Sequence, residues 1–220
     1  IRNTARFLMG NLSDFNYSED KVEYNEMFEI DKWAMHKLEE LKEKTTKYYD
    51  KYEFYSLFQE ITYFCSIEMS SFYLDIVKDR LYCEGTTSIE RRSTQTVLTE
   101  VLKVLVRIIA PVLSFTADEI WERIPETLKE EESVHLSKWI EANPEYLNEE
   151  LAKKWDKIAR LRREVNKKLE AERQTGLIGH SLDARVLLNI ANAEYSFIKD
   201  YTENEVSDLF IVSQVKFVND

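Results

Sequence analysis

Apolar residues dominate the stretch from Val97 to Ile124, around which we expect the rest of the chain to be organised. Between Leu98 and Leu113 the polar positions form one narrow stripe, made of Glu100, Lys103 and Arg107. A helix that is apolar around most of its circumference is buried on several sides. This pattern therefore predicts the central helix of a bundle.

A proline inside this stretch predicts where the central helix ends. Pro111 lacks a backbone donor and disfavours helical geometry in the residue before it, so the helix should end or kink there. A second helix is expected at once, with Thr116 as N-cap and Glu119 as its capping-box partner. Phe115 and Ile120 would then form a hydrophobic staple across the cap.

Helical spacing of apolar residues predicts three further helices before the central one. They span residues 2–12, about 25–49 and about 53–82, with Asn25 as a cap of the second and Gly85 after the third. Only four Gly and three Pro occur in 220 residues, which argues against a sandwich or a barrel.

The pattern changes after Pro125, where the chain becomes rich in Glu and loop-like. Within this part, residues 133–140 alternate as in a short extended segment. Asn148 is then expected to cap a long amphipathic helix. The tail predicts a strand at 185–190, a helix at 193–201 and one or two strands within 208–218.

These elements together predict a mainly α protein. We expect an antiparallel helical bundle, followed by a long helix and a small α/β unit. The domain boundaries that follow from the pattern are a bundle over residues 1–128, an acidic connector over 129–147 and a third part over 148–220.

Charge is distributed unevenly along the chain. The net charge of −11 argues against indiscriminate binding of nucleic acid. Residues 149–173, however, carry nine Lys and Arg against six acids, so a polyanion could dock there. From composition alone, a solvated face paired with nearby acids is favoured over a phosphate-binding surface, both here and for Arg2 with Arg6. Arg91 and Arg92 are expected to lie in a Ser-rich surface linker before the central helix.

The sequence contains no pattern that indicates catalysis or metal binding. His36, His135 and His180 are far apart in sequence and are expected to be structural or surface residues. Cys65 and Cys83 match no zinc or redox spacing, so we expect free, buried thiols in a reducing compartment.

Two further features concern ligands and location. Six aromatic residues are close together in sequence and could stack on nucleobases, although packing in the core is the favoured interpretation. They are Tyr48, Tyr49, Tyr52, Phe54, Tyr55 and Phe58.

No apolar run reaches transmembrane length and no signal peptide is evident, so we expect a cytoplasmic protein without membrane contact. The start at Ile1, without Met, suggests a fragment.

Five runs of residues resemble the anticodon-binding domain of bacterial isoleucyl-tRNA synthetases, which belong to class Ia of the aminoacyl-tRNA synthetases. They are IRNTARFLMGNL (1–12), SFYLDIVKDRLY (71–82), RRS with TVL (91–98), APVLSFTADEIW (110–121), and LRREVNKKLE (161–170) followed by IGHSLDA (178–184). The fourth run is shared more loosely with the valyl and leucyl enzymes. Residues 185–220 match only in general pattern.

The resemblance implies a function that the composition does not reveal. The parent enzyme would ligate isoleucine to its tRNA in protein biosynthesis, using ATP with Mg and, in many members, zinc. The signatures His-Ile-Gly-His and Lys-Met-Ser-Lys-Ser do not occur in this sequence. This part should therefore be inactive alone, hold no cofactor, act as a monomer and dock the anticodon stem-loop.

The residues expected to contact tRNA follow from the matched runs and the basic stripes. Arg2, Asn3 and Arg6 would face the inner side of the tRNA. Phosphate contacts are expected from Arg91, Arg92, Arg160, Arg163 and Lys167. Two alternatives remain open: a helical protein-interaction scaffold, and the equivalent module of a valyl- or leucyl-tRNA synthetase.

Overall fold

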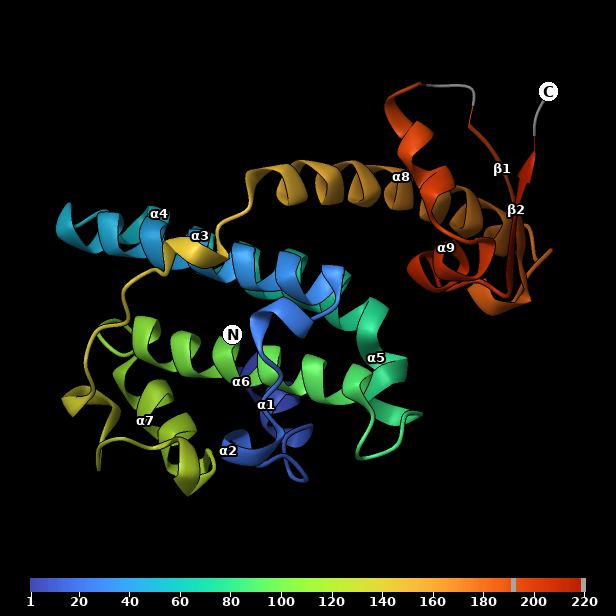
Figure 1. Ribbon diagram of the computed structural model, residues 1–220. Coiled ribbons are helices and arrows are strands. Elements are labelled where there is room, and N and C mark those ends of the chain that lie inside the picture. Colours follow the sequence, from blue (N-terminus) through green and yellow to red (C-terminus); the bar gives the residue numbers. More distant parts are fainter. Residues whose placement is uncertain (191–192, 219–220) are drawn as a thin grey trace. The chain divides into compact units, whose positions relative to one another are not determined.

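A computed structural model describes residues 1–190 and 193–218 of the protein (Figure 1). The fold is mainly α, as expected, and its sheet is limited to two short strands. The chain divides into two compact units, Ile1–Glu149 and Glu150–Asp220. No helix among the described residues is long and apolar enough to cross a membrane.

The first unit is a helical bundle with short connections. Its α-helices are α1 (Arg2–Gly10), α2 (Tyr17–Asp20), α3 (Glu29–Asp50), α4 (Phe54–Tyr63), α5 (Leu74–Tyr82), α6 (Ile89–Ile109) and α7 (Ser114–Arg123). The other helical segments are η1 (Tyr24–Glu26), η2 (Phe64–Tyr73), η3 (Glu126–Leu128), η4 (Val134–Leu136) and η5 (Pro144–Tyr146).

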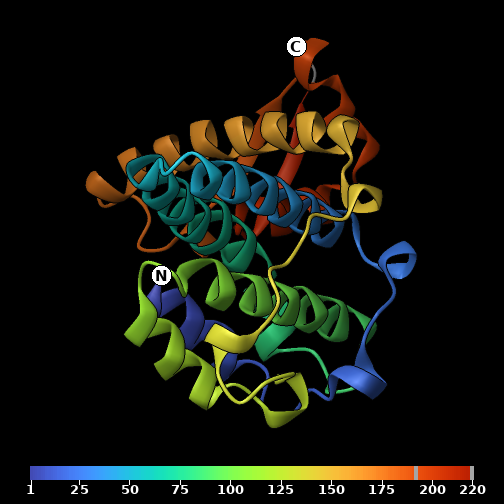
Figure 2. The ribbon, with the colours of Figure 1, turned by 90° about the vertical axis from the view of Figure 1, so that its left-hand side faces the viewer.

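Helix α6 is the central helix that the apolar pattern predicts. It contacts α1, α2, α3, α5 and α7, and Figures 1 and 2 show it running through the bundle. It begins earlier than expected because Ser88 caps it, accepting a hydrogen bond from the backbone N–H of Arg91 (3.2 Å). Arg91 and Arg92 therefore lie in the first turn of α6, and their predicted place in a linker was wrong.

The start of α7 differs from the predicted cap. The helix begins at Ser114, so Thr116 lies inside it and is not the N-cap. Phe115 is 94% exposed and forms no hydrophobic staple. The tight turn around Pro111, in which the N–H of Leu113 donates to the carbonyl of Ile109 (2.7 Å), lets α7 start three residues earlier than a Thr116 cap would allow.

The helix predicted over residues 53–82 is continuous but changes its winding. Between α4 and α5, η2 is a π-helix in which Ser70 and Ser71 donate side-chain hydrogen bonds to carbonyls five residues earlier (both 2.7 Å). A wider turn rotates the buried face, and this places Tyr73 in the core. Asn25 does not cap α3, which begins at Glu29.

One buried carboxylate joins four helical segments at the centre of this unit. Asp31 on α3 is fully buried and accepts hydrogen bonds from Tyr73 (2.7 Å) and Ser93 (2.6 Å). Arg80 donates a longer one (3.3 Å). Burial raises the pKa of Asp31 above its ordinary value, although these donors and the Arg80 charge act against the rise.

The segment after α7 packs on the bundle without forming the predicted extended piece. Residues 134–136 form the short 3-10 helix η4, so the expectation of an extended segment over 133–140 was wrong. Val134 is buried, and Trp139 donates a hydrogen bond to Thr46 on α3 (2.9 Å). The backbone of Asn143 donates to Glu39, which is also on α3 (2.6 Å).

The second unit contains the long helix and the small sheet. Its elements are α8 (Glu149–Gln174), η6 (Ser181–Asp183), β1 (Arg185–Asn189), η7 (Ala193–Asp200), α9 (Glu203–Phe210) and β2 (Gln214–Val218). The two strands are parallel, with Arg185 opposite Gln214. The strand expected within 208–218 is confirmed only from Gln214, since residues 203–210 are helical.

Candidate nucleic-acid interface

The first predicted group of contact residues lies on the open side of α1. Arg2, Asn3 and Arg6 are all exposed, at helical spacing that puts them on one face. Arg6 donates a hydrogen bond to Asn3 (2.8 Å), and Arg2 forms an ion pair with Glu119 of α7. This face is accessible, and its charge is partly balanced by Glu119.

The second group, Arg91 and Arg92, is engaged within the bundle. Arg91 donates two hydrogen bonds to the carboxylate of Asp14 (3.0 and 3.2 Å) and one to the carbonyl of Leu81. Arg92 donates to the backbone carbonyl of Asp14 (2.8 Å) and pairs with Asp20 (3.4 Å). Both side chains thus hold the connection after α1 against the start of α6.

The electrostatics of Asp14 agree with this arrangement. Partial burial acts to raise its pKa, but hydrogen bonds from Arg91 and Gln95 outweigh burial and hold the pKa below its ordinary value. The two arginines therefore have an intramolecular role in the fold. Their contact with phosphates stays a prediction.

The third group lies on α8, where Arg160, Arg163 and Lys167 are exposed. Positions 160, 163 and 167 are three and four residues apart, so the three cations follow one face of the helix. The basic side of α8 also includes Lys154 and Lys157, whose ammonium groups lie over the rings of Tyr201 and Phe197. The exposed cations therefore lie on a helix whose other side chains pack against the rest of the second unit.

One arginine of α8 has a role that the sequence reasoning did not assign. Arg162 is only 5% exposed, and its Nε donates a hydrogen bond to the carbonyl of Leu209 in the last turn of α9 (2.8 Å). The available signal was position: Arg162 is four residues after Ile158 and three before Val165, both of which are buried. Its neighbour Arg163 points to solvent.

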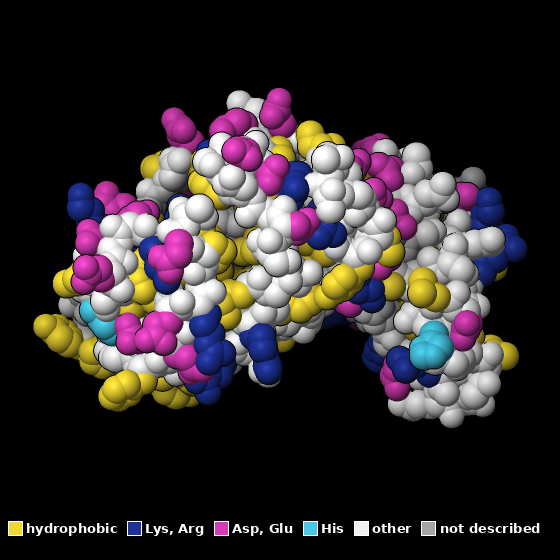
Figure 3. Space-filling view, turned by 90° about the horizontal axis from the view of Figure 1, so that it is seen from below, with side chains coloured by type: hydrophobic (Ala, Val, Ile, Leu, Met, Phe, Trp, Pro, Cys, Tyr) yellow, Lys and Arg dark blue, Asp and Glu magenta, His cyan; other side chains and the backbone are white. Residues whose placement is uncertain are grey.

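The surface charge is mixed on the face of the molecule shown in Figure 3. On the face seen in Figure 3, positive side chains lie among negative ones. Any polyanion would therefore meet local groups of cations, as expected for a chain with a net charge of −11.

Comparison with known proteins shows the family to which the chain belongs. Residues 31–188 match the family model described as the anticodon-binding domain of tRNA ligase. The chain belongs to this family. The match covers parts of both compact units, including the whole of α8.

Curated relatives of the anticodon-binding domain are also similar along the whole chain. Isoleucine–tRNA ligases of Kosmotoga olearia and Petrotoga mobilis are 48% identical to it over 99% and 100% of the chain. The enzyme of Geobacter sulfurreducens is 47% identical over 100% of the chain. The chain spans about a quarter of the length of these relatives, 24%, 24% and 23% respectively.

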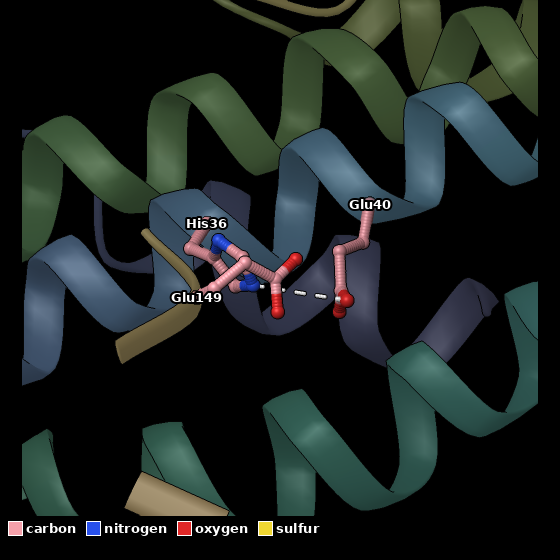
Figure 4. Close-up of side chains that lie close together, drawn as sticks. All are labelled: His36, Glu40 and Glu149. Carbon is pink, nitrogen blue, oxygen red and sulfur yellow. Dashed lines mark ion pairs between the residues drawn. The ribbon is translucent and has the colours of Figure 1, made fainter. Parts of the chain in front are cut away.

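One cluster in this anticodon-binding domain has a composition that suits a cation. His36 and Glu40 lie one turn apart on α3, and Glu149 comes close to them at the start of α8 (Figure 4). The Nδ1 atom of His36 accepts a hydrogen bond from the backbone N–H of Asn148 (2.8 Å). In a neutral ring the proton is therefore on Nε2, which is buried and lies 3.7 Å from Glu40.

This tautomer is incompatible with metal binding at His36. A metal ion would need the lone pair of Nε2, and the ring would then carry its proton on Nδ1, against the N–H of Asn148. His36 is thus a structural residue that holds the chain before α8.

His135 and His180 are exposed, Cys65 is buried as expected, and Cys83 is exposed, so the expectation of a buried thiol there was wrong.

The raised pKa of Glu68, a residue of η2, predicts how the stability of the protein depends on pH. Burial raises its pKa to about 7, and the neighbouring carboxylates of Glu40 and Glu60 add to the rise while Lys37 opposes it. The folded protein thus holds a proton between pH 4.5 and 7 that the unfolded chain releases. Stability should therefore fall as pH rises through this window, by about 3 kcal/mol.

Substitution of this residue separates its effect from the rest of the protein. In Glu68→Gln, the slope of the unfolding free energy between pH 4.5 and 7 should be much smaller than in the unmodified chain. Glu40 does not interfere. Its pKa is about 2, lowered chiefly by the neighbouring His36 ring, so the stability that its ionisation contributes is lost only below pH 4.5. Urea unfolding at several pH values measures the slope, and an unchanged slope would show that Glu68 ionises normally.

Proposed function

We propose that this chain docks the anticodon stem-loop of isoleucine tRNA, and that the protein carrying it ligates isoleucine to that tRNA with ATP. The observation that carries the proposal is similarity of 44–48% to isoleucine–tRNA ligases along essentially the whole chain. Membership of the anticodon-binding family supports the part of the proposal that concerns tRNA.

The exposed cations of each unit suit contact with the backbone of a tRNA. Phosphate contacts position an RNA, while unstacked bases of a loop are read by stacking and by hydrogen bonds to their edges. Arg6 on α1 and the exposed cations of α8 can supply phosphate contacts. Arg2 can join them once it exchanges Glu119 for a phosphate.

Other parts of the proposal concern the whole protein. Isoleucine activation would require ATP with Mg, which we place outside the matched region. A zinc ion, found in many members of the resembled family, does not fit His36, the one histidine that the described residues place with two carboxylates. A monomeric state and a cytoplasmic location complete the proposal.

The alternatives from the sequence carry less support. The relatives named above are isoleucine enzymes, which favours isoleucine tRNA over the valine and leucine tRNAs. A protein-interaction scaffold would not require the match to an anticodon-binding domain.

The salt dependence of binding to an isoleucine anticodon stem-loop tests the docking. If about four phosphates are neutralised, the logarithm of the association constant should fall with the logarithm of salt concentration at a slope near −3. Fluorescence anisotropy with a labelled stem-loop measures the slope. A slope near zero, or no binding at low salt, would contradict the proposal.

A further inference from the structure

The outer face of the α4–η2 helix is uncharged and largely apolar. Tyr55, Phe58, Tyr63 and Ile67 are 76%, 50%, 52% and 44% exposed, and they recur every three to five residues along the helix. We call these four side chains the aromatic face. The opposite side of the same helix is buried in the bundle through residues such as Leu57. A surface helix usually carries charged residues on its outer side. The α4–η2 helix differs, because it has apolar residues on both its inner and its outer side.

A groove lies along the aromatic face. Its volume is about 720 Å³, and its lining includes Phe58, Tyr63 and Ile67 together with the small polar Thr62 and Ser66. Aromatic side chains are enriched at protein interfaces. The expectation that most of the six aromatic residues between Tyr48 and Phe58 pack in the core was wrong. Tyr52, Phe54, Tyr55 and Phe58 are all exposed, and the core side of α4 is occupied by Leu57 and Ile61.

The charges around the aromatic face disfavour RNA as its ligand. Residues 52–77 contain no Lys or Arg, and they include Glu53, Glu60 and Glu68. Sites that stack nucleobases combine aromatic rings with a positive groove that follows the phosphates. The cations of α3 beside this face, Lys44 and Lys37, are paired with Glu60 and Glu68 (2.8 and 3.8 Å). The face therefore offers rings without the positive groove that a phosphate backbone would follow.

We propose that the aromatic face is an intramolecular docking surface, covered by an apolar surface with a basic rim from another part of the same polypeptide. The relatives are about four times as long as this chain, so most of their length is available to supply it. A basic rim would complement the exposed Glu53 at the start of the face, whereas Glu60 is already paired with Lys44 of α3 (2.8 Å). The proposal rests on the proposed function, because that makes the chain one part of a synthetase.

Alkylation of an introduced thiol tests this proposal directly. Tyr55→Cys is made in a Cys83→Ser background, in both the 220-residue chain and the full-length protein that carries it. Glu26→Cys, at an exposed charged position of the same unit, is the matched control. The buried Cys65 should not react. The rate of reaction with a maleimide should be about tenfold lower in the full-length protein for Tyr55→Cys, and nearly equal in both proteins for Glu26→Cys.

Each other outcome would overturn the proposal in a distinct way. Equal rates in both proteins would mean that the face stays open. Protection that appears only when isoleucine tRNA is added would assign the face to RNA, and protection of the chain alone that grows with its concentration would assign it to a second copy. The stem-loop binding assay on the same samples reports failure of the proposed function separately, since docking of the face needs no tRNA.

Discussion

Replacing Leu105 by Asp should unfold the first unit and abolish tRNA binding with it. Leu105 is 1% exposed on α6, the helix that contacts five others. A carboxylate there would be buried without a partner, which costs about 5 kcal/mol or more and equals a large part of the stability of a domain of this size. Far-UV circular dichroism should show a large loss of helix, and stem-loop binding should disappear.

A matched control for this substitution is available only a few residues away. Phe115→Asp introduces the same carboxylate at a side chain that is 94% exposed, so stability should change by no more than about 0.5 kcal/mol. Unfolding of Phe115→Asp, or a native spectrum for Leu105→Asp, would contradict the division between core and surface.

Arg162→Ala should destabilise the second unit, although the residue lies in a row of basic positions. The substitution leaves the carbonyl of Leu209 without its donor and removes a buried side chain, for a cost of about 3 kcal/mol. Hydrogen exchange measured by mass spectrometry should show faster exchange in α9 and β2, with little change in the first unit.

The adjacent Arg163→Ala is the control and the functional test together. Its side chain is exposed, so exchange in α9 should stay unchanged. The affinity for the stem-loop should fall, and the slope against salt should become less steep by about 1, as expected for the loss of one phosphate contact. If Arg162→Ala and Arg163→Ala gave the same exchange pattern, the assignment of one to the fold and the other to RNA would be wrong.

The sequence predicts the bundle because burial repeats with the helical period. α6 is apolar over most of its circumference, and the α8 positions Trp155, Ile158, Val165 and Leu169 lie buried on one side as expected. Helix starts were less predictable. Thr116 and Asn25 have suitable cap chemistry, but the turn after Pro111 and the packing of the chain before α3 set the actual starts.

The candidate site was harder to predict, since exposure depends on what packs against each helix. Arg91 and Arg163 were both expected to contact phosphates, yet Asp14 engages Arg91 within the fold while Arg163 lies on an exposed face. Arg162 and Arg163 differ by one position, which on a helix turns a side chain by about 100°. Likewise, Tyr55 is exposed because Leu57 and Ile61 occupy the side of α4 that faces the bundle.

Competition between two tRNAs tests the central claim most directly. The labelled isoleucine anticodon stem-loop is bound to the 220-residue chain and displaced with unlabelled isoleucine or valine stem-loops of equal length. We expect the isoleucine stem-loop to compete at least about tenfold better, a difference of about 1.4 kcal/mol. Equal competition by both would show phosphate binding without recognition of the anticodon, and better competition by the valine stem-loop would contradict the assignment to isoleucine.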